Sequence, residues 1–298
     1  MRVLVTGSRG RVGAAAAAAL SGRGYDVFGT DLSRPVYELP QHGVPYVQAD
    51  LRDAGDAFAV VRGHDAVVHC AAIPTWEQNT AHSVFSNNIL STFNVAEAAV
   101  SSGVRRMVNI SSAAVAGYGQ GGHQALPRYL PRDEDELPCP REVYGLAKHL
   151  GEQVLEMVWT RSGVPGISLR PSWVQHPGDY GPNLGAGLRE PVARISRWSY
   201  VDIADLVAAI VLAVESDLPG HEVFHVAAAD NPTGRSLQDL VSRFYGERIP
   251  VRPTARPDAS AVSVDKAHRL LGFTPTRSWR DHLQADGTPL PAGAAPSH

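Results

Sequence analysis

The stretch that decides the fold is Arg2-Val3-Leu4-Val5-Thr6-Gly7-Ser8-Arg9-Gly10-Arg11-Val12-Gly13. Its apolar run, residues 3–5, is typical of a parallel strand that is covered on both faces. Three glycines follow at a spacing of three, where missing side chains permit a tight turn, close helix packing and approach of the backbone to a diphosphate. The start of the helix adds free N–H groups and a partial positive charge. We therefore predict a dinucleotide-binding turn rather than a plain strand-to-helix connection, with cofactor contacts from Gly7, Arg9, Gly10, Arg11 and Val12.

An acidic residue closes the next predicted strand. That strand covers residues 26–30, and Asp31 follows it at about the distance from the glycine turn where a dinucleotide ribose is bound. A carboxylate there can accept hydrogen bonds from both hydroxyls of the adenosine ribose and would repel a 2′-phosphate, so NAD is predicted and NADP is less favoured. The competing interpretation is an exposed aspartate at a strand end. Arg9, Arg11 and Arg34 weaken the preference for NAD, because any of them can bind the 2′-phosphate of NADP.

Strand and helix patterns alternate along the rest of the chain. Further strands are predicted at residues 44–49, 66–70, 106–111, 166–170 and 223–226. Helices are predicted at residues 14–20, 81–101, 142–162, 202–215, 237–245 and 264–271. Regular βα alternation predicts an α/β fold with a Rossmann-type, doubly wound parallel sheet and a small C-terminal substrate-binding region.

The same pattern indicates how the chain is divided. Residues 1–170 are expected to form the dinucleotide-binding domain. Residues 171–286 are expected to be mainly substrate-binding, with some segments returning to the first domain, and their first part, 171–199, reads as irregular. The proline-, glycine- and alanine-rich residues 287–298 are predicted to be a disordered tail. The acidic cluster at 133–136 is interpreted as solvated surface.

Bulk properties narrow the classes of partner and compartment. A chain of 298 residues with 44% hydrophobic and 19% charged residues is ordinary for a soluble globular protein. Its formal net charge of −3 gives no basic footprint for nucleic acid, and no apolar run approaches the length of a membrane helix. Cys70 and Cys139 do not suggest a disulfide framework, which favours the cytoplasm. We expect a small-molecule substrate, no metal, no nucleic acid and no membrane partner. A homodimer is compatible with the sequence.

Several short motifs occur in a fixed order along the chain. They are Thr6-Gly7-x-x-Gly10-x-x-Gly13, Asp31, Asp50-Leu51, Ala71-Ala72, Asn88, Ser111-Ser112, Tyr144-x-x-x-Lys148, Leu169-Arg170-Pro171 and Tyr200-Val201-Asp202. In this order they resemble the extended short-chain dehydrogenase/reductase family, in particular its NAD-dependent epimerase/dehydratase branch, over most of the chain. The resemblance adds to the predicted cofactor contacts Asp50, Leu51, Ala71, Ala72, Asn88, Tyr144, Lys148 and Pro171.

The resemblance also implies the catalytic residues. Tyr144, on the predicted helix 142–162, would exchange a proton with the substrate oxygen while a hydride moves between the substrate carbon and the nicotinamide. Free tyrosine has a pKa of about 10, so nearby positive charge has to stabilise the phenolate, and Lys148 lies one helical turn on. Lys148 is also implied to hold the nicotinamide ribose, and Ser112 to donate a hydrogen bond to the substrate oxygen. In isolation, Tyr144 and Lys148 would fit the surface of an amphipathic helix.

The chain departs from the family pattern near the substrate. Ala113 and Ala114 stand where dehydratases usually carry acidic residues, which makes dehydration doubtful. Trp173 and Trp198 occupy places where nucleotide-sugar epimerases commonly have an asparagine and an arginine for the diphosphate, with Arg197 one step out of register. An indole face can lie against a sugar ring, but core packing would explain both tryptophans as well. Substrate contacts are predicted from Ile73, Ser112, Ala113, Ser172, Trp173, Arg197 and Trp198.

Three functions are compatible with these residues. The favoured one is net oxidation or reduction of a secondary alcohol or ketone on a polar, sugar-like substrate, as in the uronate dehydrogenases of the family. The second is a nucleotide-sugar epimerase that oxidises and re-reduces one carbon with tightly held NAD. The third is a non-catalytic dinucleotide sensor, which Ser112, Tyr144 and Lys148 oppose because a sensor needs no proton donor.

Overall fold

The computed structural model describes residues 1–33, 44–75, 78–117 and 126–291 of the chain. The centre of the protein is a parallel seven-stranded sheet in the order β3-β2-β1-β4-β5-β6-β9. Its strands are β1 (Arg2–Thr6), β2 (Asp26–Asp31), β3 (Tyr46–Gln48), β4 (Ala66–His69), β5 (Arg106–Ile110), β6 (Gly166–Pro171) and β9 (His221–Val226). The strand order reverses between β1 and β4, which is where sheets of this kind form a ligand-binding crevice.

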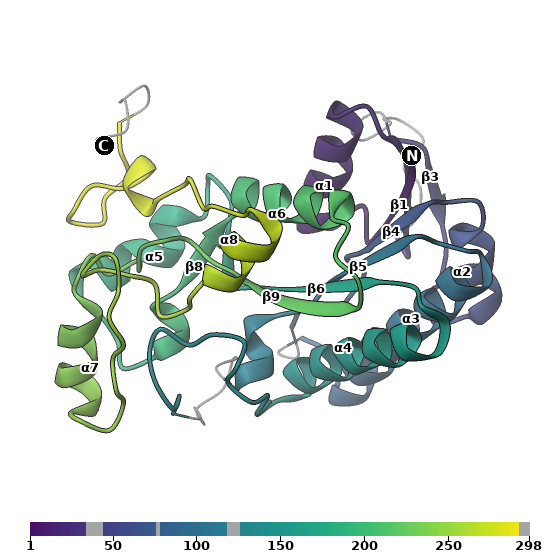
Figure 1. Ribbon diagram of the computed structural model, residues 1–298. Coiled ribbons are helices and arrows are strands. Elements are labelled where there is room, and N and C mark those ends of the chain that lie inside the picture. The colour runs from purple at the N-terminus through teal and green to yellow at the C-terminus, as the bar shows by residue number, and fades with distance from the viewer. Residues whose placement is uncertain (34–43, 76–77, 118–125, 292–298) are drawn as a thin grey trace.

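Helices cover both faces of the sheet (Figure 1). One layer contains α1 (Arg11–Gly22), α6 (Ile203–Glu215) and α8 (Asp265–Leu271), which share an apolar core with one face of the strands. The other layer contains α2 (Ala54–Val61), α3 (Ala81–Ser101) and α4 (Val143–Ser162), which pack on the opposite face. Within the first layer, the small buried side chains of Ala16 and Ala17 let α1 lie close to α6.

A smaller part of the chain lies at the left of Figure 1. It contains β7 (Trp173–Gln175) and β8 (Tyr200–Asp202), which form a separate parallel pair, and the helices α5 (Tyr180–Arg189) and α7 (Leu237–Tyr245). Three short 3-10 helices complete the described secondary structure: η2 (Ala113–Ala116), η3 (Ile195–Arg197) and η4 (Trp279–Asp281).

The sheet and most of its helices confirm the predicted α/β fold, with element ends that differ by a few residues at most. The main difference is α5, which lies inside the stretch 171–199 that the sequence presents as irregular. Gly181, Pro182, Gly185 and Gly187 fall within α5, and these residue types have the lowest helix propensity, so composition hides the helix. Tertiary packing stabilises α5 despite this low helix propensity, because Tyr180, Leu184 and Leu188 are buried along one side of the helix.

The acidic cluster at 133–136 is solvated surface only in part, because Asp135 is exposed whereas Glu134 and Glu136 are turned inward. Glu134 accepts a hydrogen bond from the backbone N–H of His225 at 2.6 Å. Glu136 is buried and accepts one from the backbone N–H of Arg128 at 3.0 Å. Both carboxylates are turned inward because backbone N–H groups that leave water need acceptors.

The predicted disordered tail is wrong for its first residues. The backbone N–H of Leu290 donates to the carbonyl of His282 at 2.9 Å, which folds this segment back on itself. Gly287 has φ = 78° and packs directly on Gly185 of α5, where a side chain on either residue would collide with the other backbone. Glycine-rich composition signals both disorder and tight turns, so it does not separate the two. Residues 292–298 lie outside the described part of the chain.

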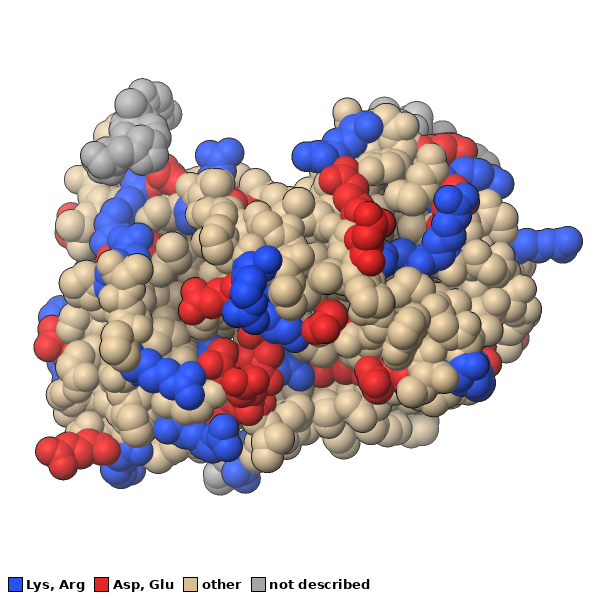
Figure 2. Space-filling model, viewed as in Figure 1, with Lys and Arg blue, Asp and Glu red and all other residues tan. Residues whose placement is uncertain are grey.

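Charge is mixed on the face of the molecule shown in Figure 2. Basic and acidic side chains lie next to one another there, and neither sign covers the face. No helix in the described ranges is long and apolar enough to cross a membrane.

The glycine turn between β1 and α1 has the close approach that its sequence predicts. Gly7 has φ = 63°, a left-handed conformation that residues with side chains rarely adopt. A Cβ atom on Gly7 would lie 2.7 Å from the backbone nitrogen of Ala71, at the end of the adjacent β4. A Cβ atom on Gly13 would collide with the carbonyl oxygen of Gly7. Helix α1 can therefore rest on the strand ends only while Gly7 and Gly13 lack side chains.

We predict that Gly13→Ala lowers the free energy of unfolding by about 2 kcal/mol, because the methyl group forces α1 away from Gly7. Urea denaturation measures the change. Gly22→Ala is the matched control, since nothing lies within 4 Å of the added methyl group at the other end of α1. That control should be neutral or slightly stabilising. Equal effects of the two substitutions would contradict the steric explanation.

Candidate active site

A cavity of about 530 Å³ lies where β1, β4, β5 and β6 end. The predicted site residues that line it are Gly7, Gly10, Arg11, Val12, Ala72, Ser112, Ala113, Tyr144, Lys148, Pro171, Ser172, Trp173 and Arg197. The predicted site residues outside its lining are Arg9, Asp31, Asp50, Leu51, Ala71, Ile73, Asn88 and Trp198. The structure thus brings the glycine turn, the tyrosine–lysine pair and part of the stretch 171–199 to one space.

The N-terminus of α1 forms one wall of this cavity. Gly10 is the N-cap residue and has no side chain to satisfy the first N–H groups of the helix, which lack partners within the helix itself. Gly10, Arg11 and Val12 all line the cavity. Arg11 also forms an ion pair at 2.6 Å with Asp179, the residue before α5. A helix end of this kind offers N–H groups and positive charge to a diphosphate.

Asp31 stands at the end of β2, beside the glycine turn. Its carboxylate accepts hydrogen bonds from the backbone N–H groups of Arg9 and Ser33, both at 3.1 Å. The guanidinium group of Arg9 lies over the ring of Tyr46, 5.0 Å from its centre. A carboxylate and a guanidinium therefore both lie at the predicted adenosine end. Arg34 is outside the described residues.

Three other predicted cofactor contacts lie outside the lining of the cavity. Asn88 is buried, and its side-chain amide accepts a hydrogen bond from the Ile73 N–H at 2.7 Å and donates one to the Ile73 carbonyl at 3.1 Å. These two bonds fix the segment after β4. Asp50 pairs with Arg52 at 2.5 Å, and the hydrogen bond from Arg52 lowers the pKa of Asp50. Leu51 lies in the apolar core.

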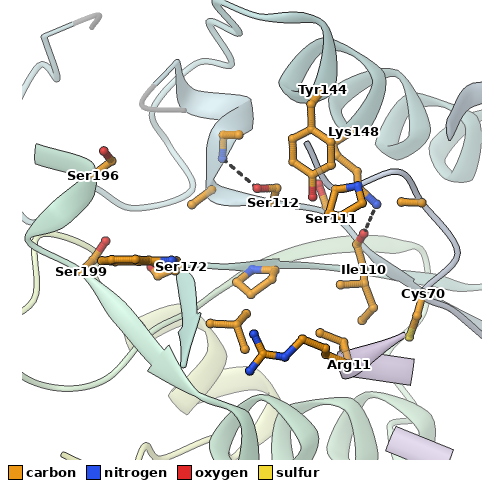
Figure 3. A pocket seen from close by; sticks show the side chains of 18 of the residues that line it. Arg11, Cys70, Ile110, Ser111, Ser112, Tyr144, Lys148, Ser172, Ser196 and Ser199 are labelled. Carbon is orange, nitrogen blue, oxygen red and sulfur yellow. Dashed lines mark hydrogen bonds between the residues drawn. The ribbon is translucent and has the colours of Figure 1, made fainter. Parts of the chain in front are cut away.

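Ser112, Tyr144 and Lys148 converge on the cavity from two elements (Figure 3). Ser112 follows β5, and its Oγ accepts a hydrogen bond from the backbone N–H of Ala114 at 3.1 Å. Tyr144 lies in the first turn of α4 and points its hydroxyl into the cavity. Lys148, one turn on, donates to the Ile110 carbonyl at 2.6 Å, with its Nζ 5.7 Å from the centre of the Tyr144 ring.

The start of α4 sets the position of Tyr144. The carboxylate of Glu142 caps this helix by accepting hydrogen bonds from the backbone N–H groups of Tyr144 and Gly145, both at 2.6 Å. A Cβ atom on Gly145 would lie 2.7 Å from the carbonyl oxygen of Ala114 in η2. The absence of a side chain at Gly145 therefore lets the turn that carries Tyr144 meet the turn that follows Ser112.

Burial controls the protonation of the pair. It raises the pKa of Tyr144 to about 12, although a hydrogen bond with Ser112 acts in the opposite direction. Burial also lowers the pKa of Lys148 to about 8. At pH 7 the ligand-free site therefore holds a neutral phenol beside a mainly protonated amine. Tyr144 needs further positive charge nearby before it can act as a base.

A buried ion pair lies behind these residues. Glu152, one turn beyond Lys148 on α4, accepts hydrogen bonds from the Ser111 hydroxyl at 2.6 Å and from two nitrogens of Arg170 at 2.8 and 2.7 Å. Burial alone would raise the pKa of Glu152, but its hydrogen bonds, chiefly those from Arg170, lower it to about 2. The ends of β5 and β6 are thereby tied to α4.

The two tryptophans have different surroundings. Trp173 lines the cavity, and the guanidinium carbon of Arg197 lies 3.8 Å from the centre of its ring. Trp198 is fully buried, donates its indole N–H to the Val192 carbonyl at 3.0 Å and packs against Tyr245. The prediction that Trp198 contacts the substrate is therefore wrong, and core packing is its role. Arg197 lines the cavity while its neighbour Trp198 is buried in the core, and sequence position alone does not show this difference.

Some of the lining is not indicated by the sequence at all. Arg132, His176, Ser196 and Ser199 belong to it, although none of them falls in a recognised motif. Arg132 is only 1% exposed. Its place next to the acidic cluster makes it look like one more surface charge, and only the pairing of this segment with residues 259–263 takes it inside.

Comparison with known proteins identifies the family. Residues 3–227 match the sequence model of the NAD dependent epimerase/dehydratase family. The chain belongs to this family. The glycine turn and the Tyr144-x-x-x-Lys148 helix are among the ordered motifs that carry the resemblance to this family in the sequence.

Relatives of this epimerase/dehydratase family member act on different sugars. The chain is 27% identical over 310 residues to a UDP-glucose 4-epimerase of Corynebacterium glutamicum, covering 92% of this chain and 91% of the relative. It is 30% identical over 227 residues to an L-arabinose 1-dehydrogenase (NAD(P)(+)) of Haloferax volcanii, covering 73% of this chain and 84% of the relative. It is 25% identical over 232 residues to a uronate dehydrogenase of Pseudomonas putida, covering 78% of each.

A solved structure points to the same cofactor. It is a short-chain dehydrogenase/reductase superfamily protein of Agrobacterium tumefaciens with bound NAD, 25% identical, with a TM-score of 0.71 and 94% of each chain covered. The chain is accordingly an NAD-dependent enzyme of the family. Its own geometry fits NAD, because the uncapped N-terminus of α1 and the bare backbone of Gly7 leave room and N–H donors for a diphosphate.

We predict a pH-dependent stability difference between the wild type and Lys148→Met. An amine whose pKa falls from 10.5 to about 8 on folding binds more protons in the unfolded chain over that interval. The native state is therefore stabilised as the pH rises from 8 towards 10.5. Relative to Lys148→Met, the wild type should gain about 2 kcal/mol in unfolding free energy between pH 7 and pH 10. Urea denaturation at several pH values measures this, and a flat difference would contradict a perturbed lysine.

We predict that the enzyme binds NAD more tightly than NADP, by about 10- to 100-fold, because the Asp31 carboxylate would face a 2′-phosphate. Asp31→Asn should narrow that ratio by removing the repulsion. Asp26→Asn, at the exposed opposite end of the same strand, is the control and should leave the ratio unchanged. Titration of both cofactors decides the point. Tighter NADP binding by the wild type would mean that the charge of Arg9 prevails.

Proposed function

We propose that this enzyme catalyses net, NAD-dependent oxidation of a secondary alcohol, or reduction of the corresponding ketone, on a compact, sugar-like substrate, in the manner of a uronate dehydrogenase. The observation that carries the proposal is the convergence of Ser112, Tyr144 and Lys148 on a cavity whose wall includes the N-terminus of α1. At about 530 Å³, this cavity has to hold the reactive end of the cofactor as well as the substrate. A small substrate suits that space better than a nucleotide-linked one.

In the proposed mechanism, Tyr144 moves the proton. Bound NAD supplies the hydride acceptor and the positive charge of its oxidised ring. The Ser112 hydroxyl holds the substrate oxygen, and the Tyr144 oxygen takes its proton as the C–H bond is broken. The Lys148 ammonium adds positive charge beside the phenol, which opposes the effect of burial on its pKa. Reduction of the ketone uses the same contacts in reverse.

Elimination of water is not part of the proposal. Ala113 and Ala114 follow Ser112 and carry no acid or base. Glu142 is the acidic residue that lines the described cavity, and both of its carboxylate oxygens already accept backbone hydrogen bonds at the start of α4. A carboxylate held in this way caps the helix and is poorly placed to abstract a carbon-bound proton.

A nucleotide-sugar epimerase is the second candidate. It is favoured by the UDP-glucose 4-epimerase relative, whose similarity extends over 92% of this chain. Such an enzyme returns the hydride to the same substrate, so it forms no free NADH. The fate of the hydride therefore separates the two functions.

We predict that Tyr144→Phe lowers kcat at least about 1000-fold, because it removes the oxygen that carries the proton. NAD binding and unfolding free energy should change little. Tyr25→Phe is the matched control, since that hydroxyl contacts Glu215 far from the cavity. Stopped-flow absorbance of NADH measures turnover. Near-normal rates for Tyr144→Phe would refute the proton role.

We predict NADH formation from at least one free sugar or sugar acid in a substrate panel. The panel contains hexoses, pentoses, hexuronic acids and UDP-, GDP- and dTDP-sugars, each incubated with the enzyme and NAD. NADH absorbance and product epimers are followed together. Epimerisation of a nucleotide sugar, without NADH from any free compound, would overturn the proposed function and establish the second candidate.

A further inference from the structure

We propose that the substrate side of the cavity contains an anion-binding subsite, built around Arg197 with Arg132 and Arg194, that recognises a carboxylate on the substrate. This inference rests on the proposed function, because it names the class of compact substrate that the enzyme oxidises. It also discriminates between acidic and neutral sugars, which the sugar dehydrogenases among its relatives do not settle.

Arg197 is the centre of the subsite. Its guanidinium carbon lies 3.8 Å from the centre of the Trp173 ring, and both residues line the cavity. Across the described ranges, no carboxylate forms an ion pair with Arg197. Stacking on an indole fixes the plane of the guanidinium group and leaves its edge available. Such an edge presents parallel N–H groups that match the two oxygens of a carboxylate.

The electrostatic environment of Arg197 favours an anion. Burial and the nearby charge of Arg194 both lower the pKa of Arg197, so holding this cation in the ligand-free protein carries a free-energy cost. Arg194 lines the same part of the cavity. A carboxylate bound between the two guanidinium groups would offset both the burial and the mutual repulsion.

Arg132 brings a third guanidinium group to the lining from a different part of the chain. Its backbone N–H donates to the Ala261 carbonyl at 3.1 Å, and its carbonyl accepts from the Ser263 N–H at 2.8 Å. This pairing holds a side chain that is 1% exposed at the cavity wall. Its positive charge also acts on buried His225, where burial and then Arg132 lower the pKa of the imidazole.

The balance of charge in the lining is strongly positive on this side. The described lining contains Arg11, Arg132, Lys148, Arg194 and Arg197, with Glu142 as its acidic member. Arg11 is engaged by an aspartate and Lys148 by a carbonyl group, both described above. On the substrate side, Arg197 forms no ion pair with a carboxylate of the described ranges, so a neutral sugar would leave its charge without a counter-ion.

The subsite lies opposite the proton-transferring residues. Ser196 and Ser199, which flank the Arg197 turn, lie across the cavity from Tyr144 and Lys148 (Figure 3). A substrate that places its reacting carbon at Tyr144 would extend its other end towards Arg197. The carboxylate is therefore expected on a carbon remote from the oxidised one.

The test compares substrates that differ in one group. Initial rates of NADH formation are measured for a hexuronic acid, the parent hexose and the hexose 6-phosphate. We expect kcat/KM for the acid to exceed that for the hexose by about 10- to 100-fold, the usual effect of one charge-assisted hydrogen-bonding group. Arg197→Met, which keeps an apolar chain on Trp173, should collapse that ratio to near one. Arg189→Met, on the exposed end of α5 outside the cavity, is the control and should preserve it.

Several results would overturn the subsite. They are a hexose used as well as the acid by the wild type, a preference for the 6-phosphate, and equal losses on acid and hexose in Arg197→Met. If no free compound yields NADH, the proposed function fails. The existence of the subsite is then tested independently, by the binding of ligands that are not turned over. Galactarate should then raise the Tm of the NAD-loaded wild type but not of Arg197→Met, whereas neutral galactitol should raise neither. Equal shifts with galactarate and galactitol would refute carboxylate recognition.

Discussion

The carboxylate of Glu152 is the constraint on which the arrangement of the site depends. It is 2% exposed and satisfied by three hydrogen bonds, two of them from Arg170. Removing one partner of such a buried pair typically costs about 3–5 kcal/mol, because the other charge is left uncompensated. The pair therefore holds its elements in a single register. Through Ser111 it fixes the end of β5, and through Arg170 it fixes the strand that leads into Pro171.

Two other features take their positions from that register. The Ile110 carbonyl, which receives the Lys148 ammonium, precedes Ser111 directly. Ser112 follows it and begins the turn against which α4 packs. The tyrosine–lysine pair and the serine thus belong to one rigid unit, although two elements distant in sequence supply them. The geometry of this unit does not by itself ionise Tyr144. Burial favours the neutral phenol until further positive charge lies nearby.

Local sequence patterns predicted most of the fold because the elements of the sheet depend mainly on local residues. Short apolar runs such as residues 3–5 specify the buried strands, and the glycine turn requires missing side chains whatever surrounds it. The failures occur where tertiary packing decides. Helix α5 forms despite its glycines because its apolar side chains find a core. Trp173 and Trp198 look equivalent in sequence, yet one lines the cavity and the other fills the core. Arg132 enters the site only through backbone pairing with a segment near residue 260.

The cover that α6 provides for α1 has a consequence for the order of folding. Helix α1 follows the first strand, but α6, which buries its alanine face, ends at Glu215, and β9 completes the sheet only at Val226. Contacts between such distant segments require large loops to close, which slows the assembly of parallel sheets. On the ribosome, α1 is thus synthesised early, but α6, which covers it, is synthesised only after about two thirds of the chain. An emerging chain would expose an apolar, alanine-rich helix for most of its synthesis, a natural target for chaperones that bind nascent polypeptides.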